Sequence, residues 1–363
     1  MWRQAYLAAL AGAALVVVVL SGCAAGDAQE PSATGTSAAD PTPTPRKGLA
    51  FDCASLASND AVSALLGVDA GAIDAGVRAV SDIGRTFSQL EAAGGGSCLW
   101  GTPEAADVEK HGASVTIDVL PNSDGAWAKL AEWYPSTSTP GADYGSYPSR
   151  GGDCAQNYCH TNILVGNVWV AGEASSPTRP SISESEFHAL MQHAVDVLAP
   201  IAGAATGVVP DAPHPACMAD EYGAAAAASF GVPQASFRAP ENMFRIEAAV
   251  GLVPGAEYCP YHPSHDGSGG VLVSLTVIPG GTAAFDHYRD LLATQGAEVT
   301  ELTLESGGNT AHAIQRTIPG VEWATTSVDV MSGDDWLSVS APMTTAGAAS
   351  GSVAFTNWVL AHR

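Results

Sequence analysis

Apolar and polar positions along this chain follow one succession of patterns twice. Within residues 49–199, an apolar helical pattern is followed by an alternating segment at 115–121, an apolar-faced helix over 126–133 and a final helix at 184–198. Alternation with a period of two is typical of a half-buried strand, whereas apolar residues three or four apart mark one face of a helix. The first half therefore predicts strands and helices in mixed order.

The same order returns in residues 216–363, with alternation at 273–279 and a last helix at about 348–362. Matched strands and helices in one order indicate a tandem duplication. We expect two similar modules, at 49–199 and 216–363, joined by an Ala-, Gly- and Pro-rich linker at 200–215.

Each module combines helices with strands that follow one another closely. This combination predicts an α+β fold, in which a largely antiparallel sheet carries helices packed on one face. The two halves are each long enough to build a hydrophobic core of their own.

The N-terminus has the three parts of an export signal. Arg3 is followed by an apolar run from Ala5 to Leu20, which closes in Leu20-Ser21-Gly22-Cys23. A transmembrane helix is the alternative, but spanning a bilayer takes about 20 apolar residues and this run is shorter. The pattern predicts a lipoprotein signal peptide at 1–22, cleaved before a lipidated Cys23.

Residues 23–48 carry the lipidated cysteine and a segment rich in Ala, Ser, Thr and Pro. This composition buries too little apolar surface to fold and favours an extended tether. A diacylated cysteine, bearing for example palmitate, anchors a protein stably. We therefore expect the folded part at the cell envelope, on the outer face of the cytoplasmic membrane.

Six cysteines remain after Cys23, and an even number in an oxidising compartment predicts disulfides. Six cysteines allow fifteen pairings. The duplication narrows this choice, since each module opens with one cysteine and carries another before its first alternating strand. The predicted bridges are Cys53–Cys98, Cys154–Cys159 and Cys217–Cys259.

Charge excludes several classes of partner. The chain has 14 Lys and Arg against 37 Asp and Glu, for a net charge of −23, and the basic residues form no cluster. Nucleic acids and anionic headgroups both require a positive surface. We expect no nucleic-acid partner, and a membrane contact through the lipid on Cys23 alone.

Motifs for catalysis are absent from the sequence: no nucleophile elbow, zinc-protease motif, phosphate-binding loop or dinucleotide fingerprint occurs. We expect no catalytic, metal or cofactor site.

The long loop over 134–148 is rich in Ser, Gly and Tyr, and long loops in compact domains often carry function. Tyr134, Tyr144 and Tyr147 are predicted as a contact surface for a partner or a sugar.

Four features together resemble actinobacterial lipoproteins of an uncharacterised, disulfide-bearing α+β domain family: the lipobox Leu20-Ser21-Gly22-Cys23, the Thr/Pro tether, the opening Cys53-Ala54-Ser55-Leu56 and the strand containing Cys98-Leu99-Trp100. Small exported domains of mycobacterial lipoproteins and kinase sensors are similar in layout. The likeness covers mainly residues 50–200. It is looser over 214–363, where Cys259-Pro260-Tyr261 replaces Cys-Leu-Trp. The resemblance implies an envelope-facing binding or sensing role.

Two functions from different classes follow. The first is a non-catalytic lipoprotein whose modules bind an envelope ligand or a protein partner. The second is an enzyme that acts on cell-wall material through a site without a sequence motif. A carboxylate in a concave pocket would favour the enzyme, and a wide apolar cavity would favour the binding protein.

Overall fold

The computed structural model describes residues 48–75, 82–106, 112–203, 216–238, 244–253, 256–264, 269–294, 299–304, 313–317 and 325–363, without the side chains of 82–86 and 313–317. The predicted signal peptide, all but the last residue of the tether, and most of the linker lie outside these residues. Within them, no helix combines the length and the apolar character that crossing a membrane requires.

The first module is built on a six-stranded antiparallel sheet in the order β1-β2-β3-β6-β5-β4. Its strands lie in chain order at Gly71–Ile73, Gly96–Gly101, Ser114–Leu120, Ser149–Ala155, Tyr158–Val165 and Val168–Ser175.

The second module repeats this sheet and adds a strand. Its order is β7-β8-β9-β13-β12-β11-β10, so β7, β8, β9, β13, β12 and β11 correspond to β1, β2, β3, β6, β5 and β4. The strands lie in chain order at Ser236–Phe237, Glu257–His262, Val273–Ile278, Val299–Leu302, Ala313–Thr317, Thr325–Ser332 and Asp335–Pro342.

Strand register matches between the modules as well as strand order. Trp169 on β6 pairs with Leu120 on β3, and Trp336 on β13 pairs with Ile278 on β9. The α+β class and the two tandem similar modules are thereby confirmed.

One face of each sheet carries the helices that open and close its module. These are α1 (Cys53–Leu56), α2 (Asn59–Leu66) and α5 (Glu184–Leu198) in the first, and η3 (Ala216–Met218), α6 (Asp220–Phe230) and α9 (Ala348–His362) in the second. A left-handed glycine ends α2 at Gly67 and α6 at Gly231, as expected at helix C-termini. Ser58 and Ser183 cap α2 and α5 by accepting backbone N–H bonds.

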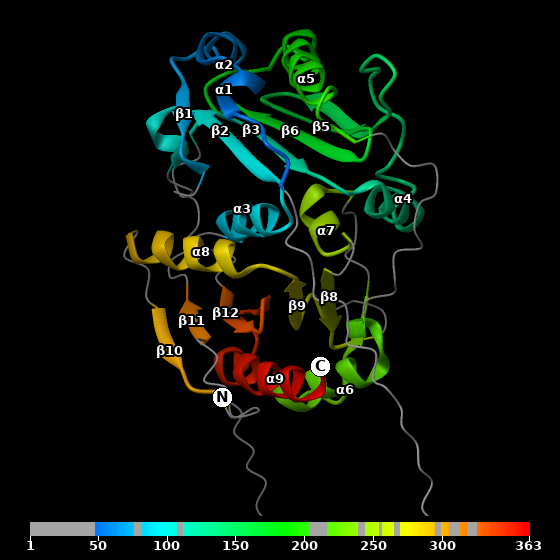
Figure 1. Cartoon of the computed structure of the whole chain (residues 1–363), viewed down its shortest axis with the longest axis vertical. Coiled ribbons are helices and arrows are strands. Elements are labelled where there is room, and N and C mark those ends of the chain that lie inside the picture. The colour runs from blue at the N-terminus through cyan, green and yellow to red at the C-terminus, as the bar shows by residue number, and fades with distance from the viewer. Residues whose placement is uncertain are drawn as a thin grey trace, which may run out of the picture. The chain divides into compact units, whose positions relative to one another are not determined.

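Helices also cover the second face of each sheet, so the prediction of helices on one face describes only the outer layer. The inner helices are α3 (Asp82–Ala92) and α4 (Asp124–Trp133) from the first module and α7 (Ile246–Val250) and α8 (Thr282–Thr294) from the second; Figure 1 shows them between the two sheets. A short η2 turn (Pro103–Ala106) follows β2.

The inner layer is required because strands such as β6 are apolar on both faces. Val168 and Val170 pack into the outer core of the first module, while Trp169 between them points into a core shared by both modules. That core joins Trp127 and Trp169 to Phe244, Phe285 and Trp336 of the second module. The two modules therefore behave as one packed body.

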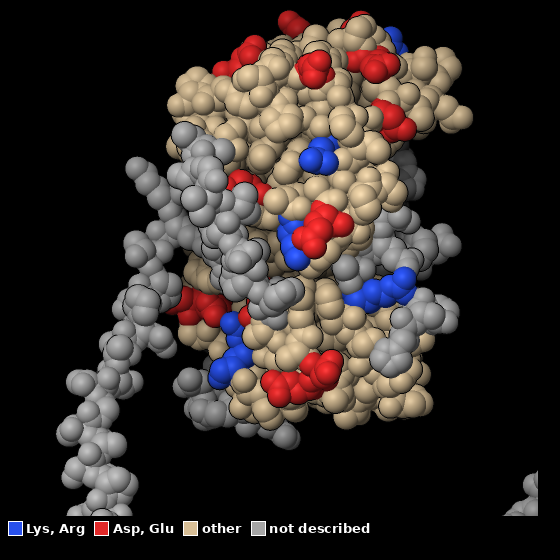
Figure 2. Space-filling view, turned by 90° about the vertical axis from the view of Figure 1, so that its right-hand side faces the viewer, with Lys and Arg blue, Asp and Glu red and all other residues tan. Residues whose placement is uncertain are grey.

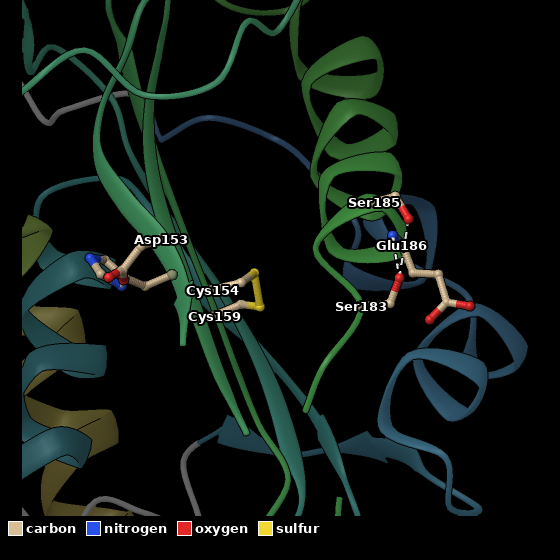
Figure 3. Close-up of a disulfide and its surroundings, with 7 residues drawn as sticks. Asp153, Cys154, Cys159, Ser183, Ser185 and Glu186 are labelled. Carbon is tan, nitrogen blue, oxygen red and sulfur yellow. Dashed lines mark hydrogen bonds and ion pairs between the residues drawn. A yellow bond between two sulfur atoms is a disulfide. The ribbon is translucent and has the colours of Figure 1, made fainter. Parts of the chain in front are cut away.

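Three disulfides stabilise this arrangement, and all three pairings match the prediction. Cys53–Cys98 joins α1 to β2, Cys217–Cys259 joins η3 to β8, and Cys154–Cys159 links β4 to β5. Figure 3 shows the Cys154–Cys159 bridge on the face of the hairpin that looks toward α5, with Asp153 on the opposite face.

Candidate functional site

The three tyrosines predicted as a contact surface do not form one. Tyr134 is buried in the shared inner core, and Tyr144, which is 2% exposed, is buried in the outer core of the first module. Tyr147 is half-buried against the outer core. The ring of Tyr144 stacks on His188 of α5 at 4.5 Å. The prediction is wrong for Tyr134 and Tyr144, because the loop folds back onto two cores and buries both rings.

A polar stripe lies on the inner face of the first sheet, beyond the edge of the shared core. Period-two alternation turns Tyr158, His160 and Asn162 of β5 to this face, together with Glu173 of β6 and Asp118 of β3. Their neighbours on the other face belong to the outer core. The alternation that places the apolar residues in the outer core thus places these polar groups together on the inner face.

Helix α7 of the second module closes this stripe into a pocket. Arg245, at the N-cap of α7, and Glu247 in its first turn complete a lining of residues from both modules. We call this the seam pocket, and its polar side chains are Asp118, Tyr158, His160, Asn162, Glu173, Arg245 and Glu247. Its volume of about 30 Å³ accommodates one or two waters, or a group of that size.

Contacts on the adjoining apolar side fix the position of α7. Phe244, just before the helix, packs against the rings of Trp127 and Trp169 with centroids 4.9 Å away in each case. Asn162 Nδ2 donates to the carbonyl of Phe244 at 3.4 Å, while Asn162 Oδ1 accepts from Trp169 Nε1 at 3.0 Å. The seam pocket is therefore built on packed elements and is formed in advance of any ligand.

Electrostatics in the seam pocket disfavour negative charge on Glu247 and Tyr158. Burial raises the pKa of Glu247, and the nearby carboxylate of Glu173 adds to this, against the lowering effect of Arg245 and of the backbone N–H. Burial likewise raises the pKa of Tyr158, again with help from Glu173. Perturbed groups of this kind in a concave site are typical of functional sites.

A hydrogen bond donated by a tryptophan indole lies next to the seam pocket, and the second module contains an equivalent one. Trp336 Nε1 donates to Asp329 Oδ1 at 3.2 Å, as Trp169 Nε1 does to Asn162. Asp329 is fully buried, and its second oxygen accepts from Ser327 Oγ at 3.0 Å. In both modules the acceptor stands seven residues before the tryptophan, a spacing that sequence reasoning missed.

A second concave feature lies on the outer side of the first module, between α1–α2 and α5. We call it the outer groove; its volume is about 570 Å³, within the usual range for ligand sites. Exposed alanines line it at positions 54, 61, 64 and 189, over a floor formed by Leu56, Leu65 and Leu190. Glu186 and His193 are its polar residues of α5.

Metal binding finds no support within the described part of the chain, where no three His, Cys, Asp or Glu side chains gather as a ligand set. Charge is also sparse: on the face in Figure 2, basic and acidic residues are scattered singly or in small groups over a largely uncharged surface. Neither observation points to a metal or to a polyanion.

Comparison of the chain with protein-family models, with curated proteins and with solved structures finds no match.

Proposed function

We propose that the protein is an extracytoplasmic lipoprotein, anchored to the membrane through Cys23, whose two modules form a single non-catalytic binding module. The lipobox and the Pro/Thr tether support the anchor. The disulfides are compatible with an oxidising compartment. The ligand site in this proposal is the seam pocket.

One observation carries the proposal: ionisable groups of both modules converge where the modules meet. Arg245 and Glu247 come from the second module, and Asp118, His160 and Glu173 come from the first. An apolar side chain in place of Glu247 would stabilise the fold at least as well, because burial removes hydration from this carboxyl group. A carboxyl group that costs the fold stability in this way is best explained by a ligand that it recognises.

Charge and size together define the ligand group. Three carboxyl groups face one guanidinium in the seam pocket, a balance that favours a cationic group. The volume of about 30 Å³ admits the end of a molecule and not a whole one. We infer that the pocket takes the amine-bearing end of an envelope component, with the rest of that component outside.

Native mass spectrometry of the full chain purified from its own host tests this proposal. We expect a lipid adduct on Cys23 together with a retained, amine-bearing ligand that the Glu173→Gln, Glu247→Gln double variant loses. Glu132→Gln is the matched control, because Glu132 pairs with Lys129 on the exposed side of α4. A chain that carries no ligand, or a ligand that the double variant retains, contradicts the assignment.

The enzyme acting on cell-wall material is the second candidate, and Glu247 is the observation that favours it. A carboxyl group whose pKa is raised by burial can act as a general acid. The small volume of the pocket argues against bound polymer. Release of soluble fragments from purified cell wall, abolished by Glu247→Gln, would favour the enzyme over the binding protein.

A further inference from the structure

The two modules differ in how their outer helices meet, although these helices correspond in order and position. In the second module, aromatic side chains fill the space between α6 and α9. The rings of Tyr222 and Trp358 are 5.0 Å apart, edge to face. The Phe230 ring lies so close to Gly351 that a Cβ at this glycine would approach it to 2.6 Å. These two helices are therefore in direct contact.

In the first module the corresponding helices, α2 and α5, present alanines to the space between them. Ala61, Ala64 and Ala189 are exposed at the outer groove, and none of the described residues that line it is Phe, Tyr or Trp. The duplicated fold thus leaves open in one module the space that aromatic side chains close in the other. The groove therefore has room for a large apolar side chain.

Specific links fix the walls of the outer groove in place. The Cys53–Cys98 disulfide fixes α1 on the sheet, and His193 of α5 makes a 3.1 Å hydrogen bond to the carbonyl of Ser55. The Arg179 guanidinium donates to the carbonyl of Leu65 at the end of α2. A groove held in this way is formed before binding, which lowers the entropic cost of binding.

The outer groove carries acidic charge. Glu186 lines it, and Figure 3 shows its side chain pointing away from the sheet. Asp52, at the N-cap of α1, and Glu184, the first residue of α5, are exposed on two of the helices that form its walls. Arg179 is engaged with backbone carbonyls. This charge distribution complements a basic partner and opposes an acidic one.

We propose that the outer groove binds a basic amphipathic helix of a partner protein, which inserts an aromatic side chain between α2 and α5. The outer groove has an apolar floor, helical walls and carboxylates beside it. Grooves between helices with an apolar floor bind the apolar face of an amphipathic helix. The site is separate from the seam pocket, and either can be correct without the other.

A synthetic peptide tests the proposal by isothermal titration calorimetry against the full chain. The peptide has about 14 residues, or four helical turns, with Trp and Leu on one face and Lys on the other. We expect it to bind, to bind more weakly at raised ionic strength, and to bind more tightly than the same peptide with Glu in place of Lys.

Two variants fill the groove without disturbing the core. Ala61→Trp and Ala189→Trp each place an indole in the groove from an exposed position, so the fold is retained and affinity falls at least about tenfold. Ala224→Trp, at an exposed position of the corresponding helix α6, is the matched control and leaves affinity unchanged.

Three results would overturn this proposal. They are a native chain that does not bind the lysine peptide, equal binding of the lysine and glutamate peptides, and equal affinity in the groove variants and Ala224→Trp. Self-association of the native chain that both groove variants abolish would assign the groove to a second copy instead. Thermal melting of each variant verifies that it is folded.

Discussion

At the scale of single residues, the repeated contact between an indole and its acceptor is the clearest mark of duplication. Trp169 donates to Asn162, and Trp336 donates to Asp329, across equivalent strand pairs. The acceptor is an amide in one module and a carboxyl in the other. Because the geometry is shared, the acceptor oxygen is what the fold requires at this position.

This equivalence predicts that Asp329→Asn is tolerated and Asp329→Ala is not. Asparagine keeps an oxygen for Trp336 and an amide for Ser327, whereas alanine leaves a buried indole N–H unpaired. We expect Asp329→Ala to lower the free energy of unfolding by about 1–3 kcal/mol, and Asp329→Asn to lower it by less than half as much. Urea denaturation measures both, and equal losses would contradict the equivalence.

Residue-level prediction from the sequence worked for residues whose neighbours in the chain define their environment. Period-two alternation placed Val115–Pro121 in a strand, and β3 covers it up to Leu120. The same reasoning failed for Tyr134 and Tyr144, because burial of loop residues depends on contacts distant in sequence. Tyr144 stacks on His188, which is 44 positions away.

At the scale of elements, the disulfides follow from the duplication, whereas the inner helical layer does not. One cysteine in each opening segment and one on β2 or β8 was enough to predict two of the bridges. The position of α3, α4, α7 and α8 between two sheets depends on how the modules pack together. No pattern within one module contains that information.

Loop length predicts different contributions from the disulfides. In the chain-entropy model, the Cys53–Cys98 bridge, 45 residues apart, contributes about 4 kcal/mol, and Cys154–Cys159, five apart, about 2 kcal/mol. Each pair is replaced by serines, and urea denaturation compares the two free energies of unfolding. An equal or greater loss from the short bridge would show that local strand pairing depends on it more than the chain-entropy model allows.

At the scale of the whole molecule, the shared core joins the two modules into one body. The seam pocket is a polar region beyond the edge of this core. The sequence predicted two modules but could not reveal this pocket, because its walls come from β5 and from α7, which are more than 80 residues apart. Glu247 and Arg245 differ from their sequence neighbours in lining this pocket, and they line it only when both sheets are in place. The pocket is thus a property of the assembled fold.

We propose that the seam pocket is kept for binding at a cost in stability. The folded-state pKa of Glu247 is raised above its unfolded value of 4.5. Its contribution to stability is therefore fully present below about pH 4.5 and is lost as pH rises through the folded pKa. Above pH 4.5 the burial of this carboxyl group therefore costs the fold stability, and Glu247→Gln removes this cost.

Thermal unfolding of Glu247→Gln at pH 7 and at pH 4, beside the native chain and the Glu132→Gln control, tests the claim most directly. We predict that Glu247→Gln melts about 1–4 °C above the native chain at pH 7, with the difference vanishing at pH 4. A variant that melts below the native chain at pH 7 would show that Glu247 holds the modules together and that the seam pocket does not cost the fold stability.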